Sequence, residues 1–330
     1  MTGVRGGYAG LVLTSALTLI GMFQATIRQS TEFETQMVSV ERLIEYQSIK
    51  SEAVLTSSKC DAIIGQWPNE GCIRFDHVFL TYSDNTNPVL SDICLNIVGG
   101  EKVGVVGRTG AGKSSLITAI FRLVEPKGVI RIDGVDIKSI GLHELRSKIS
   151  IIPQDPVLFS GTIRRNLDPF NQFSDNQLWQ SLVDSNLDKL IQNMVGQLDG
   201  EVTDGGSNLS VGQRQLVCLA RALLRNNKIL ILDEATANVD YETDELIQTT
   251  IRTKFTDCTV MTIAHRLNTV IDMDQVLVLD AGQVKEYDAP YLLLEQRGLF
   301  YNMVQKTGAQ HASMLIDIAK RSFLSKQKLI

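Results

Sequence analysis

The residues best suited to chemistry form a single glycine-rich run. They are Gly107, Arg108, Thr109, Gly110, Ala111, Gly112, Lys113 and Ser114, followed by Ser115. The run fits G-x-x-x-x-G-K-[ST], a pattern in which successive backbone N–H groups surround the phosphates of a nucleotide. Lys113 supplies a cation for the β- and γ-phosphates, and the Ser114 hydroxyl is a ligand for Mg²⁺. We therefore predict that the chain binds a nucleoside triphosphate.

The segments on either side of this run fit a phosphate-binding loop. The apolar stretch 103–106 predicts a strand, and the spacing of apolar residues in 116–123 predicts a helix. The loop would then lie at a helix N-terminus, where free N–H groups and the helix dipole favour anions. A chance glycine-rich turn is the alternative, and the strand–loop–helix setting argues against it.

An acidic pair follows the apolar run 229–232, which is typical of a strand buried on both faces of a parallel sheet. Ligands of open α/β sheets bind beyond the carboxyl ends of the strands, which is where Asp233 and Glu234 lie. Asp233 is suited to hold Mg²⁺ through water, and Glu234 to polarise the water that attacks the γ-phosphate. The structural alternative is an acidic pair that caps the following helix.

Three further residues are weak candidates when each is taken alone. His265 follows the predicted strand 260–264, which would place its imidazole near the γ-phosphate, although an isolated histidine is more often structural. Gln154 ends the extended stretch 150–154 and could reach Mg²⁺ or the attacking water. Tyr82 ends a predicted strand and offers a ring on which adenine could stack. The alternative for Tyr82 is an exposed tyrosine at a strand edge.

A second glycine-bearing helix start lies at Leu209-Ser-Val-Gly-Gln213. Ser210, Gly212 and Gln213 would form another anion site there, because side-chain hydroxyls and N–H groups meet at the start of a helix. A nucleotide site within one chain does not need this second site. It is suited to a γ-phosphate that a facing domain holds.

The candidates follow one another along the chain as Tyr82, 107–115, Gln154, 209–213, Asp233–Glu234, Asp240 and His265. This order resembles the nucleotide-binding domain of an ATP-binding cassette (ABC) protein, over about residues 71–306. The resemblance implies an A-loop, Walker A, Q-loop, signature, Walker B, D-loop and H-loop at these positions. It also implies ATP and Mg²⁺ as cofactors and another nucleotide-binding domain as partner.

The sequence resembles the second nucleotide-binding domain of the multidrug-resistance-associated, C-subfamily exporters in four stretches, which are 153–159, 163–168, 209–215 and 235–240. The resemblance implies the C-terminal part of a longer transporter, in which ATP hydrolysis powers export of organic anions or drug conjugates. The partners would be the first nucleotide-binding domain and the transmembrane domains. One alternative is a nucleotide-gated regulatory domain of a channel or channel regulator. Another is a soluble cassette ATPase, against which the apolar N-terminal run speaks.

The signature departs from the general family pattern at one position. Val211 stands where the pattern has glycine, and it adds a β-branched side chain beside the expected phosphate site. In the C subfamily this departure accompanies an asymmetric pair of sites. The resemblance therefore implies that the Walker motifs and Glu234 form the hydrolytic site with the partner's signature, whereas the signature here faces a weaker site.

The remaining pattern predicts an α/β fold, which the family resemblance specifies as a P-loop NTPase (RecA-like) core with an antiparallel β-subdomain. Alternation predicts strands at 72–82 and 93–98, Gly99-Gly100 predicts a hairpin turn, and Asp133-Gly134 predicts a second hairpin. Helical spacing through about 155–225 indicates a helical insertion, which includes a capping box at Ser174–Gln177.

The N-terminal segment 6–27 carries no charge and is long enough to cross a bilayer as a helix. A signal peptide and a buried soluble helix are the alternatives. Residues 28–51 become amphipathic and predict that the helix continues into the cytosol. We expect an integral membrane protein, in the plasma membrane, with a cytosolic nucleotide-binding domain. Because the membrane part stops at about one helix, we expect the chain to be the end of a longer protein.

The domain boundaries that follow are 1–55 for the last transmembrane helix and its extension, 56–70 for a linker, 71–308 for the nucleotide-binding domain and 309–330 for a C-terminal tail. The tail is either a docking helix or a solvated segment. With 330 residues, 44% hydrophobic content and a net charge of −5, the chain lacks the basic excess of a nucleic-acid-binding protein. Its five cysteines contain no C-x-x-C pair, which indicates a reducing compartment.

Overall fold

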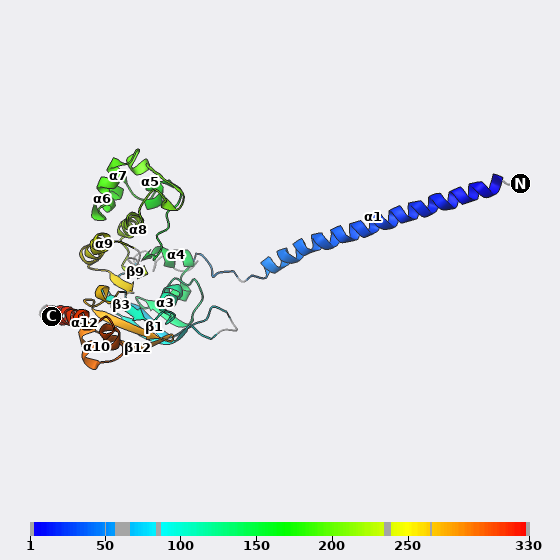
Figure 1. The fold of residues 1–330 in the computed structure, drawn as a ribbon. Helices are drawn as coiled ribbons and strands as arrows, with labels where there is room; N and C mark the ends of the chain where they lie inside the picture. The colour runs from blue at the N-terminus through cyan, green and yellow to red at the C-terminus, as the bar shows by residue number, and fades with distance from the viewer. Residues whose placement is uncertain are drawn as a thin grey trace. The chain divides into compact units, whose positions relative to one another are not determined.

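A computed structural model describes residues 3–49, 51–56, 67–83, 87–233, 239–264 and 266–327. The chain separates into two compact units, Met1–Ala53 and Val54–Ile330 (Figure 1). The first unit contains α1 (Gly3–Gln47), one continuous helix. Its span Gly6–Gln47 has the length and composition needed to cross a membrane. The predicted continuation of the helix beyond the apolar segment is confirmed as far as Gln47.

The second unit is built on a six-stranded sheet with the order β12-β11-β3-β10-β9-β6. Its strands are β3 (Lys102–Gly107), β6 (Ile149–Ile152), β9 (Ile229–Asp233), β10 (Thr259–Ile263), β11 (Gln275–Asp280) and β12 (Gln283–Asp288). All neighbours are parallel except β11 and β12. The apolar run in β9 is buried on both faces, since Ile229 and Ile231 enter one core and Leu230 and Leu232 another. Each such side chain stabilises the fold by about 1.5–3 kcal/mol.

A four-stranded antiparallel sheet with the order β2-β1-β4-β5 packs on this core. Its strands are β1 (Ile73–Leu80), β2 (Leu90–Ile97), β4 (Lys127–Ile132) and β5 (Val135–Asp136). The hairpin predicted at Asp133-Gly134 joins β4 to β5. The hairpin predicted at Gly99-Gly100 is wrong. Both edges of β3 are occupied by β10 and β11, so the turn connects two different sheets.

Short helices form the far end of the second unit, where Figure 1 shows α5, α6 and α7 together. The elements are α5 (Ile163–Leu167), α6 (Asp175–Asp184), α7 (Asp188–Asn193) and α8 (Val211–Arg225), with β7 (Gly161–Thr162) and β8 (Glu201–Val202). Ser174 and Gln177 form the predicted capping box at the start of α6. Leu178, Leu182 and Leu219 share the core of this region.

The remaining helices are α3 (Lys113–Ile120), α4 (Leu142–Ser147), α9 (Tyr241–Lys254), α10 (Pro290–Gln296), α11 (Leu299–Gln305) and α12 (Ala309–Gln327), with short 3-10 turns at 137–139, 197–199, 204–206 and 267–269. The C-terminal tail forms α12, which buries Ala312, Leu315 and Ala319 in the core that also holds Phe300.

The start of α4 has an unusual set of partners. The N–H groups of Leu142 and His143 donate to the carbonyl oxygens of Val54 (3.1 Å) and Leu55 (2.9 Å). The first N–H groups of a helix have no partner within the helix, so residues 54 and 55 act as an external cap.

Candidate nucleotide-binding site

The glycine-rich run forms the turn between β3 and α3, as its sequence predicts. Gly112 caps α3 with a φ of 100°, in the left-handed region that other residues enter at a cost. A Cβ on Gly112 would also lie 2.8 Å from Leu90 Cδ2. Glycine is therefore required at this position by both backbone conformation and packing.

The Lys113 ammonium is directed back over the loop. It donates to the carbonyl oxygens of Gly107 (3.0 Å) and Arg108 (3.3 Å), and the residue is only 7% exposed. Ser114, the next residue along the first turn of α3, is exposed. The loop thus holds one cation at its centre, and the helix N-terminus presents a hydroxyl to solvent, an arrangement suited to an anionic ligand.

Two segments from outside the loop contact it. The Tyr82 and Ser115 hydroxyls are 3.1 Å apart, while Tyr82 stays 54% exposed. On the other flank, the Gly282 N–H donates to the Ala111 carbonyl at 3.1 Å. The sequence prediction included Tyr82 but missed the β11–β12 turn at Gly282. Gly282, which comes soon after the apolar run of β11, was the signal that could have found it.

Asp233 and Gln154 lie at the same edge of the sheet as the loop. In the parallel register, Asp233 of β9 pairs with Ile263 of β10, and Ile263 pairs with Val105 of β3. Gln154 is exposed and follows β6, the neighbour of β9 on its other side. The structure therefore brings the loop, Asp233 and Gln154 to the carboxyl edge of one sheet. The predicted catalytic residues Glu234 and His265 lie outside the described residues.

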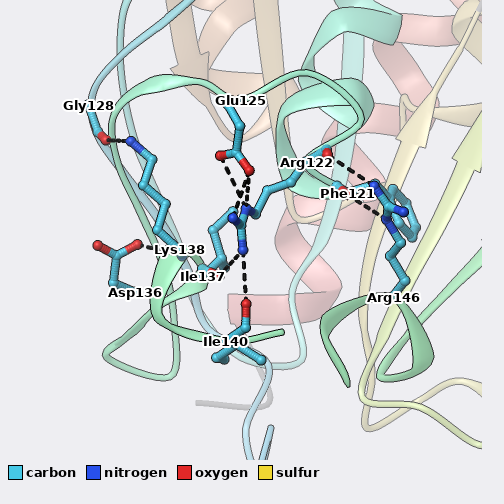
Figure 2. Close-up of polar contacts among 9 residues, drawn as sticks. All are labelled: Phe121, Arg122, Glu125, Gly128, Asp136, Ile137, Lys138, Ile140 and Arg146. Carbon is cyan, nitrogen blue, oxygen red and sulfur yellow. Dashed lines mark hydrogen bonds and ion pairs between the residues drawn. The ribbon is translucent and has the colours of Figure 1, made fainter. Parts of the chain in front are cut away.

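The C-terminal end of α3 is fixed by two arginines (Figure 2). Arg146 of α4 donates to the carbonyl oxygens of Phe121 and Arg122, at 3.0 Å each. Buried Arg122 in turn donates to the carbonyls of Ile137 and Ile140 and pairs with Glu125. These bonds anchor the helix that carries Lys113 and Ser114 at the end opposite the phosphate loop.

The signature residues begin α8. Ser210 caps the helix by accepting the Gln213 N–H, and the Gln213 side chain accepts the Ser210 N–H. A Cβ on Gly212 would lie 3.2 Å from Thr243 Cγ2 and 3.3 Å from Asp240 Oδ1, so this glycine permits close packing on the start of α9. Within the signature, Gly212 thus packs on the start of α9. The side chain of Val211 points outward, with 38% of the residue exposed.

Asp240 is held as a carboxylate at that contact. The N–H and the hydroxyl of Thr243 donate to it at 3.0 Å each, and these bonds hold the pKa of Asp240 below its usual value. Asp240 caps α9, which is the ordinary structural use of an aspartate at a helix N-terminus.

The sequence profile described as "ABC transporter" matches residues 90–237, which include the phosphate loop, the signature and β9. This nucleotide-binding domain belongs to the ABC transporter family.

Similar proteins place the ABC domain within one branch. The chain is 56% identical over 321 residues to ATP-binding cassette sub-family C member 4 of Homo sapiens. This alignment covers 97% of this chain and 24% of that protein. The chain is 50% identical over 311 residues to ATP-binding cassette sub-family C member 2 of Rattus norvegicus, with 94% and 20% covered. The chain therefore spans about a quarter or less of the length of these curated relatives. The predicted C-subfamily membership is confirmed.

A solved structure agrees with the fold of the ABC domain. The structure of a bacterial Atm1-family ABC exporter with ATP bound matches with a TM-score of 0.73 and 32% identity, covering 89% of this chain and 50% of that chain. The predicted P-loop core with an antiparallel β-subdomain is confirmed, and the family implies that the domain binds ATP.

Residues that the sequence prediction did not single out connect the parts of the ABC domain. Gln215 of α8 is fully buried and donates to the Pro153 carbonyl at 2.9 Å, immediately before Gln154. Arg221 donates to the Asn166 carbonyl at 2.6 Å and to the Val157 carbonyl at 2.9 Å. Burial lowers the pKa of this guanidinium, which stays charged all the same. The segment around Gln154 is therefore bound to the helix that begins with the signature.

A groove of about 280 Å³ opens beside that segment. Val157 and Phe159 line it and are 59% and 63% exposed, and Arg165 and Arg225 add positive charge. Exposed apolar side chains next to basic ones are typical of a surface that contacts another protein segment.

Proposed function

We propose that this chain is the ATP-hydrolysing motor at the C-terminal end of a C-subfamily exporter, where it powers export of organic anions or drug conjugates. The observation that carries the proposal is the set of groups at one sheet edge, with Lys113 over the loop, Tyr82 beside it and Asp233 at the end of β9. The similarity to sub-family C proteins and to an ABC exporter supports it.

Within this proposal, the phosphate loop and Lys113 bind the triphosphate and stabilise the charge that develops on it during hydrolysis. Ser114, Asp233 and Gln154 would hold Mg²⁺, and all three offer the oxygen atoms that this ion prefers. The ion would supply charge stabilisation at the β- and γ-phosphates. Glu234 polarises the attacking water, and His265 contacts the γ-phosphate. Tyr82 stacks on adenine.

We assign residues 210–213 to a partner's nucleotide. Ser210 and Gly212 lie at a helix start that is exposed at Ser210 and Val211, so a second nucleotide-binding domain could bring its γ-phosphate there. The first nucleotide-binding domain of the full-length transporter is the proposed partner. Val211 would narrow this site, which makes the pair of sites asymmetric.

The groove at Val157 and Phe159 is the proposed contact for the transmembrane domains. Closure of the domain pair on ATP would move Gln154, and the bonds from Gln215 and Arg221 would carry this movement to the groove. Residues 6–27 would be the last transmembrane helix, in the plasma membrane, and the rest of α1 and the ABC domain would lie in the cytosol.

The first test is the ATPase rate of the full chain in detergent against its concentration. A rate per molecule that rises with concentration, and is lost in Glu234→Gln, is expected if two copies form working sites. Glu242→Gln, an exposed acid on α9, is the matched control. A flat, near-zero rate with intact ATP binding would instead show that a different partner domain is needed. Normal hydrolysis by Glu234→Gln would contradict the role of Glu234.

A nucleotide-gated regulator of a channel is the less favoured alternative. Uptake of a labelled organic anion into vesicles that contain the full-length protein distinguishes an exporter from a channel regulator. ATP-dependent uptake that is lost in Lys113→Met supports export, whereas ATP binding without any uptake supports regulation.

A further inference from the structure

A cluster of three metal-ligating side chains lies on the four-stranded sheet. His77 Nδ1 is 2.6 Å from Asp92 Oδ1, and Cys94 Sγ is 3.5 Å from His77 Nδ1 and 4.0 Å from Asp92 Oδ1. All three residues are exposed, and one potential ligand atom from each lies within 4.8 Å of the others. An imidazole, a carboxylate and a thiol thus face one point on the surface.

The strand register explains why these side chains converge. Val78 of β1 pairs with Ile93 of β2, and the pairing shifts between Phe75 and Val78, which marks a bulge next to His77. A bulge re-aims the side chain at that position. His77 and Asp92 both have positive φ, 48° and 54°, a conformation in which histidine and aspartate are enriched.

The neighbouring apolar residues hold the cluster at the surface. Val78, Ile93 and Leu95 are buried on the opposite face, so the strands cannot rotate to hide the polar set. Asp92 and Cys94 come from one strand and His77 from the other. The arrangement is therefore fixed by the fold and does not depend on flexible loops.

The donor set selects a class of ion. Mg²⁺ and Ca²⁺ take oxygen ligands almost exclusively, whereas nitrogen, sulfur and oxygen together suit Zn²⁺ and similar transition metals. Ligand bonds of about 2.0–2.3 Å in a tetrahedron place donor atoms roughly 3.4–3.6 Å apart. The sulfur–nitrogen distance of 3.5 Å fits, and the sulfur–oxygen distance of 4.0 Å is slightly long. The nitrogen–oxygen pair at 2.6 Å must open by less than about 1 Å.

We propose that His77, Asp92 and Cys94 form a surface site for a divalent transition metal of the Zn²⁺ type, separate from the nucleotide's Mg²⁺. On binding, the Cys94 thiol releases its proton to solvent, and the proton on His77 Nδ1 is lost to solvent while Nε2 carries the remaining ring proton. Three metal–ligand bonds then replace the hydrogen bond between His77 and Asp92. The fourth position of the tetrahedron is left to water or to one side chain of another protein. The ion joins β1 to β2.

The two joined strands both lead to the nucleotide site. β1 ends just before Tyr82, and β2 begins at Leu90, whose side chain packs against Gly112. A bound ion would therefore stiffen the hairpin that supplies the expected adenine-stacking side chain. The site itself does not depend on ATP hydrolysis, so its test is independent of the proposed function.

The test is a titration of the chelator-treated full chain in detergent with Co²⁺, in the presence of excess Mg²⁺. One Co²⁺ per chain is expected, with a sulfur-to-metal charge-transfer band and the visible bands of a tetrahedral ion, both removed by Zn²⁺. Cys94→Ser should lose the charge-transfer band. His77→Gln and Asp92→Asn should each weaken Co²⁺ binding at least tenfold.

Cys72→Ser is the matched control, because Cys72 immediately precedes β1 and its sulfur accepts the Gly99 N–H rather than meeting the cluster. It should keep the full Co²⁺ spectrum. ATP binding by each variant shows that the variant is folded. We expect all three variants to fold, because the substituted side chains are exposed. A charge-transfer band that survives in Cys94→Ser, or no Co²⁺ binding by the unmodified chain, would overturn the proposal.

Thermal unfolding gives a second readout. Zn²⁺ should raise the Tm of the unmodified chain, because a ligand that binds the folded state stabilises it by mass action. The shift should vanish in His77→Gln and remain in Cys72→Ser. An equal Zn²⁺ shift in His77→Gln would assign the stabilisation to other residues.

Discussion

The hydroxyls of Tyr82 and Ser115 lie 3.1 Å apart, so the residue that follows β1 is joined to the helix that carries the phosphate loop. The ring stays more than half exposed at 54%, which leaves its face open to a base. One residue thus combines a fixed hydroxyl with an available aromatic surface. Substitution can therefore test the contribution of the hydroxyl and that of the ring to nucleotide binding separately.

Tyr82→Ala should weaken ATP binding by about 1–3 kcal/mol, because the stacking surface is lost. Tyr82→Phe should keep most of the affinity, since it removes only the hydroxyl. Equilibrium binding of ATP measures both variants, with inorganic tripolyphosphate as the ligand that has no base. If Tyr82→Ala weakened the binding of tripolyphosphate as much as that of ATP, the result would argue against stacking.

Lys113→Met should weaken ATP binding roughly 10- to 100-fold, because a charged hydrogen bond to phosphate contributes about 1.5–3 kcal/mol. The control is Lys285→Ala, an exposed lysine on β12 that bonds Gln283. Binding of a fluorescent ATP analogue reports the difference. Unchanged affinity in Lys113→Met would remove Lys113 from the phosphate site.

Asn166→Ala should destabilise the helical region by about 2–4 kcal/mol. Asn166 is 2% exposed, donates to the carbonyls of Phe159 and Thr162, and accepts the Phe159 N–H and an Arg221 N–H. Alanine leaves several of these buried groups without partners. Thermal unfolding measures the loss, and exposed Gln192→Ala on α7 should leave Tm nearly unchanged. Equal Tm values for the two variants would mean that water replaces the network.

Glu101→Gln should stabilise the chain at pH 7. Burial raises the pKa of Glu101, and Asp274 adds to the rise, while a hydrogen bond from the Val98 N–H opposes it. A raised pKa means that the folded state disfavours the charge, so the penalty is absent below the unfolded pKa and complete above the folded pKa. The gain in unfolding midpoint should therefore shrink to nothing as pH falls towards 4. A gain of the same size at both pH values would point to a cause other than ionisation.

Val211→Gly should raise ATP hydrolysis by paired copies of this chain if the valine side chain narrows the signature site. Val211→Ala removes the β-branch without the backbone cost of glycine, which is about 0.5–1 kcal/mol in a helix, and should give an intermediate rate. The ATPase rate at high protein concentration is the measurement. Rates equal to that of the unmodified chain would place the asymmetry elsewhere.

Much of the fold could be predicted because the pattern of apolar residues follows the burial. The run 229–232 predicts a doubly buried strand, and its side chains do alternate between two cores. The turn at Gly99-Gly100 was predicted wrongly, since local sequence states that the chain turns but not which strand it joins. That choice is made by distant partners, here β10 and β11 on either side of β3.

The backbone geometry of the candidate site was predictable where chemistry demands a fixed spacing, as in the turn at 107–115. The site was not predictable where polar groups meet only in three dimensions. Gln215 and Pro153, or Asn166 and Arg221, carry no local pattern because their partners lie far away along the chain. The cluster of His77, Asp92 and Cys94 was not predictable either, because a bulge brings the three side chains together and their spacing in the sequence does not indicate the bulge.

The cap that residues 54 and 55 place on α4 has a mechanical consequence. Tension on the chain that arrives from residue 53 would load the bonds from Leu142 and His143 before it reaches β1. Because Arg146 of the same short helix holds the carbonyls of Phe121 and Arg122, the load would pass to the end of α3. In a pulling experiment from residue 53, we expect α4 to detach before the sheet shears. The helix that carries Lys113 is thus connected to the incoming chain through α4.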